Sequence, residues 1–168
     1  MNSIGDWIKE AECPLKHEFA ADHRNFTKGL VGLIEAVEKN EWAVAAAAAE
    51  VVNRENGPHV AFEEEILYPY VAETRGRSFV QSLYEEHRIV ILAIRFLLEH
   101  PSGDGVTPEQ RRQVIEGLQA GLGHAVACGS LLSYFVDLNE KQQEAFLAEL
   151  HRCRREGKTL LELEHPTA

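Results

Sequence analysis

Apolar residues recur every three or four positions along most of the chain, which is the period of an amphipathic α-helix. The first such segment runs from about residue 15 to residue 39, and its inward positions are Phe19, His23, Phe26, Leu30, Leu33, Ile34 and Val37. A second segment begins near Trp42, after Asn40, whose residue type commonly caps a helix N-terminus. No alternation of period two competes with this pattern, so the sequence predicts helices and no strands.

Glycine and proline indicate where the second segment is interrupted. Asn56, Gly57 and Pro58 follow one another, and a proline inside a helix removes one backbone hydrogen bond. We therefore expect a kink or a short break at 56–58, a restart at Pro58, and an end near residue 71. A third helix is predicted from about residue 78 to residue 99, before a loop rich in glycine.

Two capping boxes mark the starts of later helices. Thr107 with Gln110 precedes a fourth helix that is expected to reach about residue 136. Asn139 with Gln142 precedes a shorter fifth helix, which the following glycine at 157 ends.

Four long helices joined by short loops favour an all-α, up-down-up-down four-helix bundle. The fifth helix, at about 139–156, is appended to this bundle, and residues 1–12 form a short N-terminal arm. A chain of 168 residues is the size of one domain. We therefore expect a single domain over 1–168 with a bundle core at about 15–137.

Composition narrows the classes of function. The net charge of −10 would repel nucleic acid and anionic membranes. The sequence contains no run of about 18 apolar residues, so no membrane span is expected. The three cysteines, Cys13, Cys128 and Cys153, are far apart and form no CxxC pair, and the N-terminus has no signal-peptide pattern. We expect a cytoplasmic protein without structural disulfides.

Four of the eight histidines lie on the apolar face of a different long helix, namely His23, His59, His87 and His124. His23 and His87 follow their helix starts by about nine residues, and the other two precede their helix ends by about twelve. At about 1.5 Å per residue, all four share one level of an antiparallel bundle. Buried imidazoles need polar partners, and a metal ion at the bundle centre would satisfy all four.

Glu63 adds a carboxylate to this set. It follows His59 by four residues, so both side chains lie on the same helix face. An imidazole and a carboxylate are suitable ligands for iron, zinc or manganese. The residues therefore predict a metal site made by His23, His59, Glu63, His87 and His124.

The chain resembles the hemerythrin-like HHE cation-binding family over about residues 15–137. The stretch from His59 to Pro69, HVAFEEEILYP, is similar to the family's H-x-x-x-E-E-x-x-L-[YF]-P block. Three further segments are similar to its other histidine blocks, namely Asp22-His23-Arg24, Glu85-Glu86-His87-Arg88 and the stretch from His124 to Phe135. The resemblance implies a four-helix bundle with a non-haem di-iron centre that binds, senses or handles O₂, NO or peroxide.

Two positions depart from the family pattern. Cys128 stands four residues after His124, where the resemblance implies a second carboxylate, and Ile91 stands four residues after His87, where oxygen carriers place another histidine. With one inner carboxylate a di-iron centre is short of negative charge, so a mononuclear iron site stays open. Cys128 is either a thiolate ligand or a small residue that packs.

Other residues near the predicted site have two interpretations. Small side chains surround His124 on the fourth helix, which indicates either close helix packing or a cavity for a substrate or a flat cofactor. Tyr70 shares the helix face of His59 and is a candidate neighbour of the site or an aromatic cap of the bundle end. Glu64 and Glu65 are expected to be solvated charges that border the site.

Three functions fit these observations. The first is an iron protein that binds O₂, NO or peroxide. The second is an iron-dependent oxidase, oxygenase or peroxidase. The third is a degenerate bundle, metal-free or haem-binding, that acts as an interaction module. The sequence identifies no redox partner, and it leaves open both catalytic turnover and a homodimer.

Overall fold

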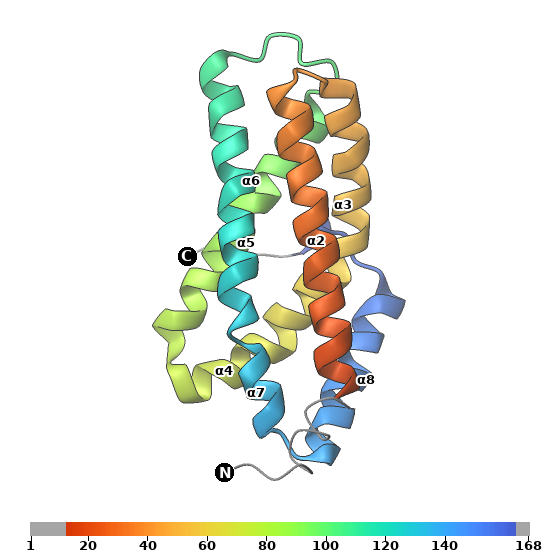
Figure 1. The fold of residues 1–168 in the computed structure, drawn as a ribbon, viewed down its shortest axis with the longest axis vertical. Coiled ribbons are helices and arrows are strands. Elements are labelled where there is room, and N and C mark those ends of the chain that lie inside the picture. Colours follow the sequence, from red (N-terminus) through yellow and green to blue (C-terminus); the bar gives the residue numbers. More distant parts are fainter. Residues whose placement is uncertain (1–12, 164–168) are drawn as a thin grey trace.

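Four long helices run side by side along the long axis of the molecule (Figure 1). In chain order they are α2 (Pro14–Glu38), α3 (Trp42–Phe62), α5 (Arg77–Glu99) and α6 (Pro108–Gly129). Helices α2 and α5 each contact both α3 and α6, which gives the square arrangement of an up-down-up-down bundle. The computed structural model describes residues 13–163, and over these the predicted all-α bundle is confirmed. The predicted arm at 1–12 lies outside the described residues.

The turn between α2 and α3 differs from the prediction. Asn40 has a φ of 56° and ends α2, while the N-cap of α3 is Glu41 without a side-chain hydrogen bond. The Asn40 N–H donates to the Val37 carbonyl at 3.1 Å, and the Glu41 N–H donates to the Ala36 carbonyl at 2.9 Å. This is the Schellman pattern, which asparagine suits because it tolerates the left-handed conformation.

Of the kink or short break predicted at 56–58, the short break is wrong, because α3 continues through Pro58 to Phe62. The missing N–H of Pro58 removes one backbone bond, while the Asn56 amide donates to the Val52 carbonyl at 3.0 Å and adds one within the helix. Gly57 has a different role, since a Cβ there would lie 2.0 Å from the carbonyl oxygen of Lys158. The glycine therefore allows the C-terminal chain to pass directly against α3.

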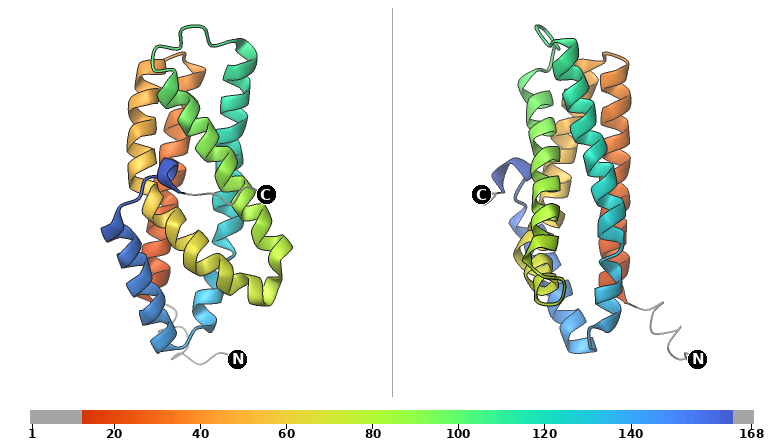
Figure 2. Two further views of the ribbon diagram at one scale, coloured as in Figure 1. Left: turned by 180° about the vertical axis from the view of Figure 1, so that it is seen from behind. Right: turned by 90° about the vertical axis from the view of Figure 1, so that its left-hand side faces the viewer.

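The irregular turn follows instead at η1 (Glu63–Leu67), which is π-helical and leads into α4 (Tyr68–Arg75). The Tyr68 N–H donates to the carbonyl of Glu63, five residues earlier, which is the π-helical bond. From behind, the chain leaving α3 crosses the lower half of the molecule diagonally into α4 (Figure 2, left). Such π turns are frequent at functional sites.

Helix α6 ends at Gly129, before the predicted end near residue 136, and the short helix α7 (Leu132–Asp137) follows separately. The Ser130 hydroxyl donates to the Ala127 carbonyl at 2.6 Å, and the Ser133 hydroxyl donates to the Ser130 carbonyl at 2.8 Å. Side-chain hydroxyls of this kind compete with the helical backbone pattern.

The appended helix α8 (Glu140–Glu156) starts at the predicted Asn139 capping box and ends at Gly157, whose φ is 64°. The capping box of Thr107 at the start of α6 is also confirmed. Helix α8 packs against α2 and α3, and the short η2 (Leu160–Glu162) packs against α3 and α5. Within the described part of the chain, no helix is both long and apolar enough to cross a bilayer.

Two apolar clusters fill the bundle, one above the other in the orientation of Figure 1. The upper cluster contains the fully buried side chains Leu30, Leu33, Ile94, Leu97 and Leu118. The lower cluster contains the fully buried side chains Phe19, Phe62, Tyr68, Leu131 and Phe135. On α2, α5 and α6 a histidine comes between the two clusters in chain order, as His23 does between Phe19 and Phe26. These histidines, with His59 and Glu63, form a polar layer.

Candidate metal centre

The five predicted ligands come together in this polar layer. They are His23 on α2, His59 on α3, Glu63 on η1, His87 on α5 and His124 on α6. Four of them are 1–3% exposed, and the side chain of His23 is 12% exposed. Every helix of the bundle therefore contributes to one buried group of polar side chains.

Glu63 lies between two pairs of imidazoles. Its Oε1 is 3.5 Å from His23 Nε2 and 3.4 Å from His59 Nε2. Its Oε2 is 3.0 Å from His87 Nε2 and 3.9 Å from His124 Nε2. We name the space among His23, His59 and Oε1 the first position, and the space among His87, His124 and Oε2 the second position. One carboxylate thus faces both positions, as a bridging ligand does.

The outer nitrogen of each imidazole faces an oxygen. The contacts are His23 Nδ1 to Phe19 O at 3.1 Å, His59 Nδ1 to Asp22 Oδ2 at 3.4 Å, His87 Nδ1 to Glu64 Oε1 at 2.8 Å, and His124 Nδ1 to Glu86 Oε2 at 2.7 Å. An oxygen at Nδ1 favours the tautomer with its proton there, which leaves the Nε2 lone pair free. All four Nε2 atoms point inward, and each offers a lone pair once its ring is neutral.

Sequence reasoning did not assign the three carboxylates Asp22, Glu64 and Glu86 to the site. The expectation of a solvated Glu64 is wrong, since its side chain is 9% exposed and contacts His87. Each of the three is next to a predicted ligand in the sequence but contacts a histidine on another helix. Asp22, for example, directly precedes His23 in the sequence but contacts His59. The position of each carboxylate next to a predicted ligand was the one signal in the sequence, and it does not show which histidine the carboxylate contacts.

The centre contains buried polar atoms that protein groups do not satisfy. Glu63 Oε1 and both ring nitrogens of His59 have no hydrogen-bond partner among residues 13–163. The 3.4 Å contact of His59 with Asp22 is longer than a normal hydrogen bond. Each such atom costs about 1–3 kcal/mol. A cation between His59 Nε2 and Glu63 Oε1 would satisfy both, and this set of imidazoles and carboxylate fits iron or zinc.

The charges in the centre are strongly coupled. Burial alone would raise the pKa of Glu63, but the facing imidazoles outweigh it and hold that pKa well below its usual range. Burial alone would lower the pKa of His59, but the carboxylates of Glu63 and Asp22 raise it to about 9. The carboxylates of Glu63 and Glu64 likewise overcome burial and raise the pKa of His87 to about 9. In the metal-free protein, protons therefore neutralise the carboxylate that a cation would otherwise neutralise.

A phenol and a thiol border the second position. Tyr68 Oη is 3.2 Å from His87 Nε2 and 3.5 Å from His124 Nε2. Cys128 Sγ is 3.1 Å from His124 Nε2 and 3.6 Å from Tyr68 Oη. Burial raises the pKa of both groups, so both are neutral at pH 7 in the metal-free protein.

The π-helical turn determines which tyrosine reaches the centre. In a regular α-helix, Tyr68 would point about 140° away from Glu63, because five residues turn the helix by that angle beyond one full turn. In a π turn, residues five apart lie above one another, and Tyr68 therefore joins Glu63 on the inner face. Tyr70, the residue favoured by α-helical spacing, packs against Phe146 of α8 with ring centroids 5.3 Å apart.

Close packing accounts for the small residues on α6. A Cβ on Gly121 would lie 2.6 Å from Val90 Cγ2 and 2.8 Å from Leu30 Cδ1. A Cβ on Gly117 would lie 3.1 Å from the Cβ of Ala93. These glycines bring α6 against its neighbours. Of the two interpretations, close packing therefore holds at Gly117 and Gly121, where neighbouring side chains fill the space that a flat cofactor would need.

The remaining histidines lie away from this layer. His17 is exposed, and the His151 ring contacts Glu18 at 2.9 Å on the outside of the bundle. The His100 ring stacks on Phe96 near the opposite end of α5, with centroids 4.0 Å apart. His165 lies outside the described residues.

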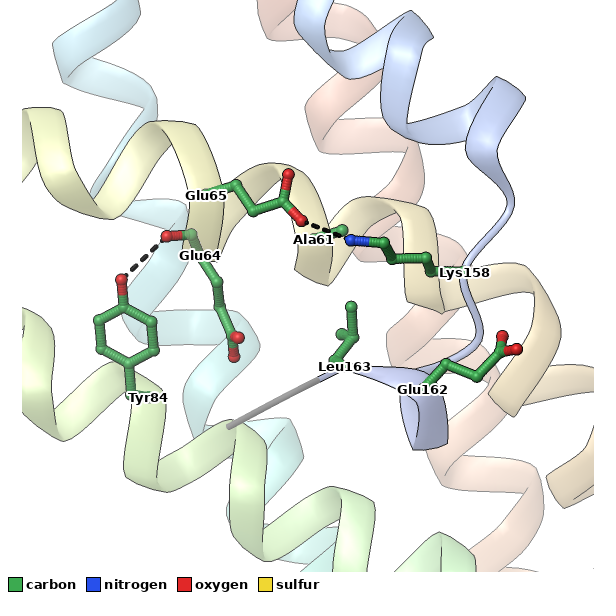
Figure 3. A pocket seen from close by; sticks show the side chains of 7 residues that line it. All are labelled: Ala61, Glu64, Glu65, Tyr84, Lys158, Glu162 and Leu163. Atoms are coloured by element: carbon green, nitrogen blue, oxygen red, sulfur yellow. Dashed lines mark hydrogen bonds and ion pairs between the residues drawn. The ribbon is translucent and has the colours of Figure 1, made fainter. Parts of the chain in front are cut away.

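A pocket of about 380 Å³ opens beside η1 (Figure 3). It is lined by Ala61, Glu64, Glu65, Tyr84, Lys158, Glu162 and Leu163. The Tyr84 hydroxyl donates to the Glu64 carbonyl at 2.9 Å, and the Lys158 ammonium donates to Glu65 at 3.1 Å. Glu64 lines the pocket and also contacts His87, so one carboxylate connects the pocket with the second position.

Comparison with known protein families identifies one domain. A family model described as the hemerythrin HHE cation binding domain matches residues 15–127. This range contains all five candidate ligands and ends one residue before Cys128, so α7 and α8 lie beyond it. No curated protein and no solved structure gives a significant match to the chain.

Proposed function

The chain belongs to the hemerythrin HHE cation-binding family, and we propose that it holds iron inside the bundle. The proposed ligands are His23, His59, Glu63, His87 and His124, and the proposed function is to handle O₂ or a related small ligand such as NO or peroxide. Family membership supports a cation site. The choice of iron, the ligand set and the small ligand are our inference.

One observation carries this proposal, namely the orientation of the four imidazoles. Every Nε2 turns toward the Glu63 carboxylate, while every Nδ1 faces an oxygen. Proteins use such outer oxygens to fix the ring and tautomer of a metal ligand. Apolar packing alone gives no reason for four buried histidines from four helices to direct their Nε2 atoms at one carboxylate.

We propose two iron positions. His23, His59 and Glu63 Oε1 make a set of two histidines and one carboxylate at the first position, which is a known arrangement for iron(II). The second position has His87, His124 and the other oxygen of Glu63. A single iron would leave one of these histidine pairs without an ion, so two positions fit the ligand set better than the mononuclear alternative.

Iron in these positions would supply a redox-active centre to which O₂, NO or peroxide can bind. The chain supplies the surroundings of that centre. Glu64 and Glu86 hold the rings of His87 and His124, and the two apolar clusters keep bulk water from the layer. The Tyr68 hydroxyl is placed to donate a hydrogen bond into the second position.

An iron-dependent peroxidase or oxidase is a second candidate. The pocket beside η1 favours it, because Glu64 links a space of about 380 Å³ to a ligand of the second position. A carboxylate there can carry protons between the pocket and the centre. Consumption of peroxide by the iron-loaded protein, with several turnovers per iron, would distinguish turnover from reversible binding.

Metal content and visible absorption test the main proposal. Protein purified from iron-rich medium is expected to contain about two irons per chain and to change its visible spectrum when O₂ or NO is added. His59→Ala should lose most of the iron. His100→Ala is the matched control, because His100 lies near the far end of α5 and should not affect iron content. A colourless wild-type protein with no iron would contradict the proposal. A Soret band would also contradict it, because that band would show that the protein binds haem instead.

A further inference from the structure

Cys128 differs from the other cysteines in the atoms around its sulfur. It is fully buried, and its Sγ lies 3.1 Å from His124 Nε2, the nitrogen that faces the second position. Sγ, a ring nitrogen of His124 and a carboxylate oxygen of Glu63 all lie within 4.8 Å of one another. Cys153 is equally buried but belongs to neither group of candidate ligands found in the described part of the chain.

The spacing of these atoms fits ligands of one ion. A nitrogen about 2.0 Å and a sulfur about 2.3 Å from the same metal are about 3.1 Å apart at a right angle and about 3.5 Å apart at the tetrahedral angle. The distance from Cys128 Sγ to His124 Nε2 is 3.1 Å. His124 and Cys128 are also four residues apart on α6, as His59 and Glu63 are at the end of α3. Each pair thus brings a histidine and a potential anion to the same helix face.

Charge gives a second reason. Two divalent irons bring at least four positive charges into the polar layer, while Glu63 is the only carboxylate whose two oxygens both face the imidazole Nε2 atoms among residues 13–163. A thiolate at Cys128 would add a second inner negative charge at the second position.

We infer that Cys128 is a thiolate ligand of the second metal position, beside His87, His124 and Glu63. This inference rests on the proposed function and extends it to the identity of a ligand. When the metal binds, the S–H bond breaks, a sulfur–metal bond forms, and one proton leaves to the solvent. No change of oxidation state is needed.

The thiolate also determines which metals the second position accepts. Sulfur ligands select iron, zinc and other softer ions over magnesium, calcium and manganese, which prefer oxygen. The first position, with two nitrogens and one oxygen, has no such selection. The two positions are therefore expected to differ in metal preference within one chain.

The test uses the full-length protein loaded with cobalt(II), whose bonds to sulfur give a distinct charge-transfer absorption in the near ultraviolet. The wild type is expected to show this absorption, and X-ray absorption at the cobalt edge is expected to show sulfur at about 2.3 Å. Cys128→Ser should lose both signals and weaken binding of the second cobalt by at least about tenfold. Cys153→Ser is the matched control and should keep both signals.

Each outcome decides between the inference and its alternatives. Two cobalt ions in both the wild type and Cys128→Ser, without a sulfur signal in either, would overturn the thiolate and leave the proposed metal centre intact. A wild type that binds no cobalt and no iron would overturn both. If Cys128→Ser does not fold by circular dichroism, the sulfur signal of the wild type and of Cys153→Ser still decides the question.

Discussion

The Arg154 guanidinium lies 3.0 and 2.9 Å from the two carboxylate oxygens of Asp22. Arg154 belongs to the appended helix α8, beyond the range of the family match, and it also pairs with Glu18. Asp22 Oδ2 in turn is 3.4 Å from His59 Nδ1. A chain of contacts therefore connects α8 to His59, a proposed ligand of the first position.

Arg154→Gln is expected to weaken metal binding at the first position. Without the guanidinium, Asp22 is free to turn away from His59, and loss of such an outer contact costs about 10- to 100-fold in metal affinity. The free energy of unfolding should fall by no more than about 1 kcal/mol, because the pair is partly exposed. Competition titration with a chelator measures the affinity, and Arg155→Gln is the control. Equal affinity in both variants would exclude a role of α8 in the centre.

Glu63→Gln should abolish the coupling among the imidazoles. The neutral amide no longer compensates the charge on His59 and His87, so the pKa of each ring should fall from about 9 toward or below its usual value. Iron content should fall below one per chain. NMR titration of the ring protons in the metal-free protein measures the pKa values. Glu65→Gln, at a partly exposed ion pair with Lys158, should leave both rings unchanged.

The metal-free protein is expected to lose stability as pH rises from 6.5 through about 9. His59 and His87 have folded-state pKa values of about 9 against a usual 6.5, so their stabilising contribution is complete below 6.5 and is lost through about 9. Burial lowers the pKa of His23 to about 4, so this ring is neutral in the folded protein throughout that window, and its contribution changes only near pH 6.5, where the unfolded chain loses the corresponding proton.

Thermal unfolding across pH measures this effect. The Tm of the metal-free protein should be several degrees lower at pH 9.5 than at pH 6.5. In the iron-loaded protein the ions replace the ring protons, so the same change of pH should have a smaller effect. A metal-free Tm that rises over this window would show that the rings are not protonated.

Tyr68→Phe should keep the metal and change the binding of small ligands. The hydroxyl lies 3.2 Å from His87 Nε2 and would donate one hydrogen bond to a small ligand at the second position, and such a bond contributes about 0.5–1.5 kcal/mol. NO dissociation from the iron-loaded protein should become roughly 2- to 10-fold faster, as stopped-flow absorption would measure. Tyr70→Phe is the control, because that ring packs against Phe146. The same dissociation rate in both variants would show that the Tyr68 hydroxyl does not contact the bound small ligand.

Gly121→Ala should destabilise the bundle, since the new Cβ would meet Val90 at 2.6 Å and Leu30 at 2.8 Å. Overpacking of this kind costs about 1–3 kcal/mol. Gly123→Ala has nothing within 4 Å of the new Cβ and should stabilise α6 by up to about 1 kcal/mol. Urea unfolding measures both, and a neutral Gly121→Ala would show room beside the centre.

The sequence by itself determined the helical class of the fold and the common level of four histidines and Glu63. Helical period and the capping boxes at Thr107 and Asn139 depend on neighbours along the chain, and both are present in the structure. The common level of the four histidines also follows from counting residues along helices of constant rise. Glu63 was found for the same reason, because its spacing from His59 is a local property.

Tertiary structure alone decided how these residues are connected. Asp22 contacts His59 and Glu86 contacts His124 because of which helices are neighbours, and Arg154 reaches Asp22 because of where α8 docks. The π-helical turn that brings in Tyr68 has no period of its own in the sequence. These features depend on packing between segments far apart in the chain, which no local pattern of residues records.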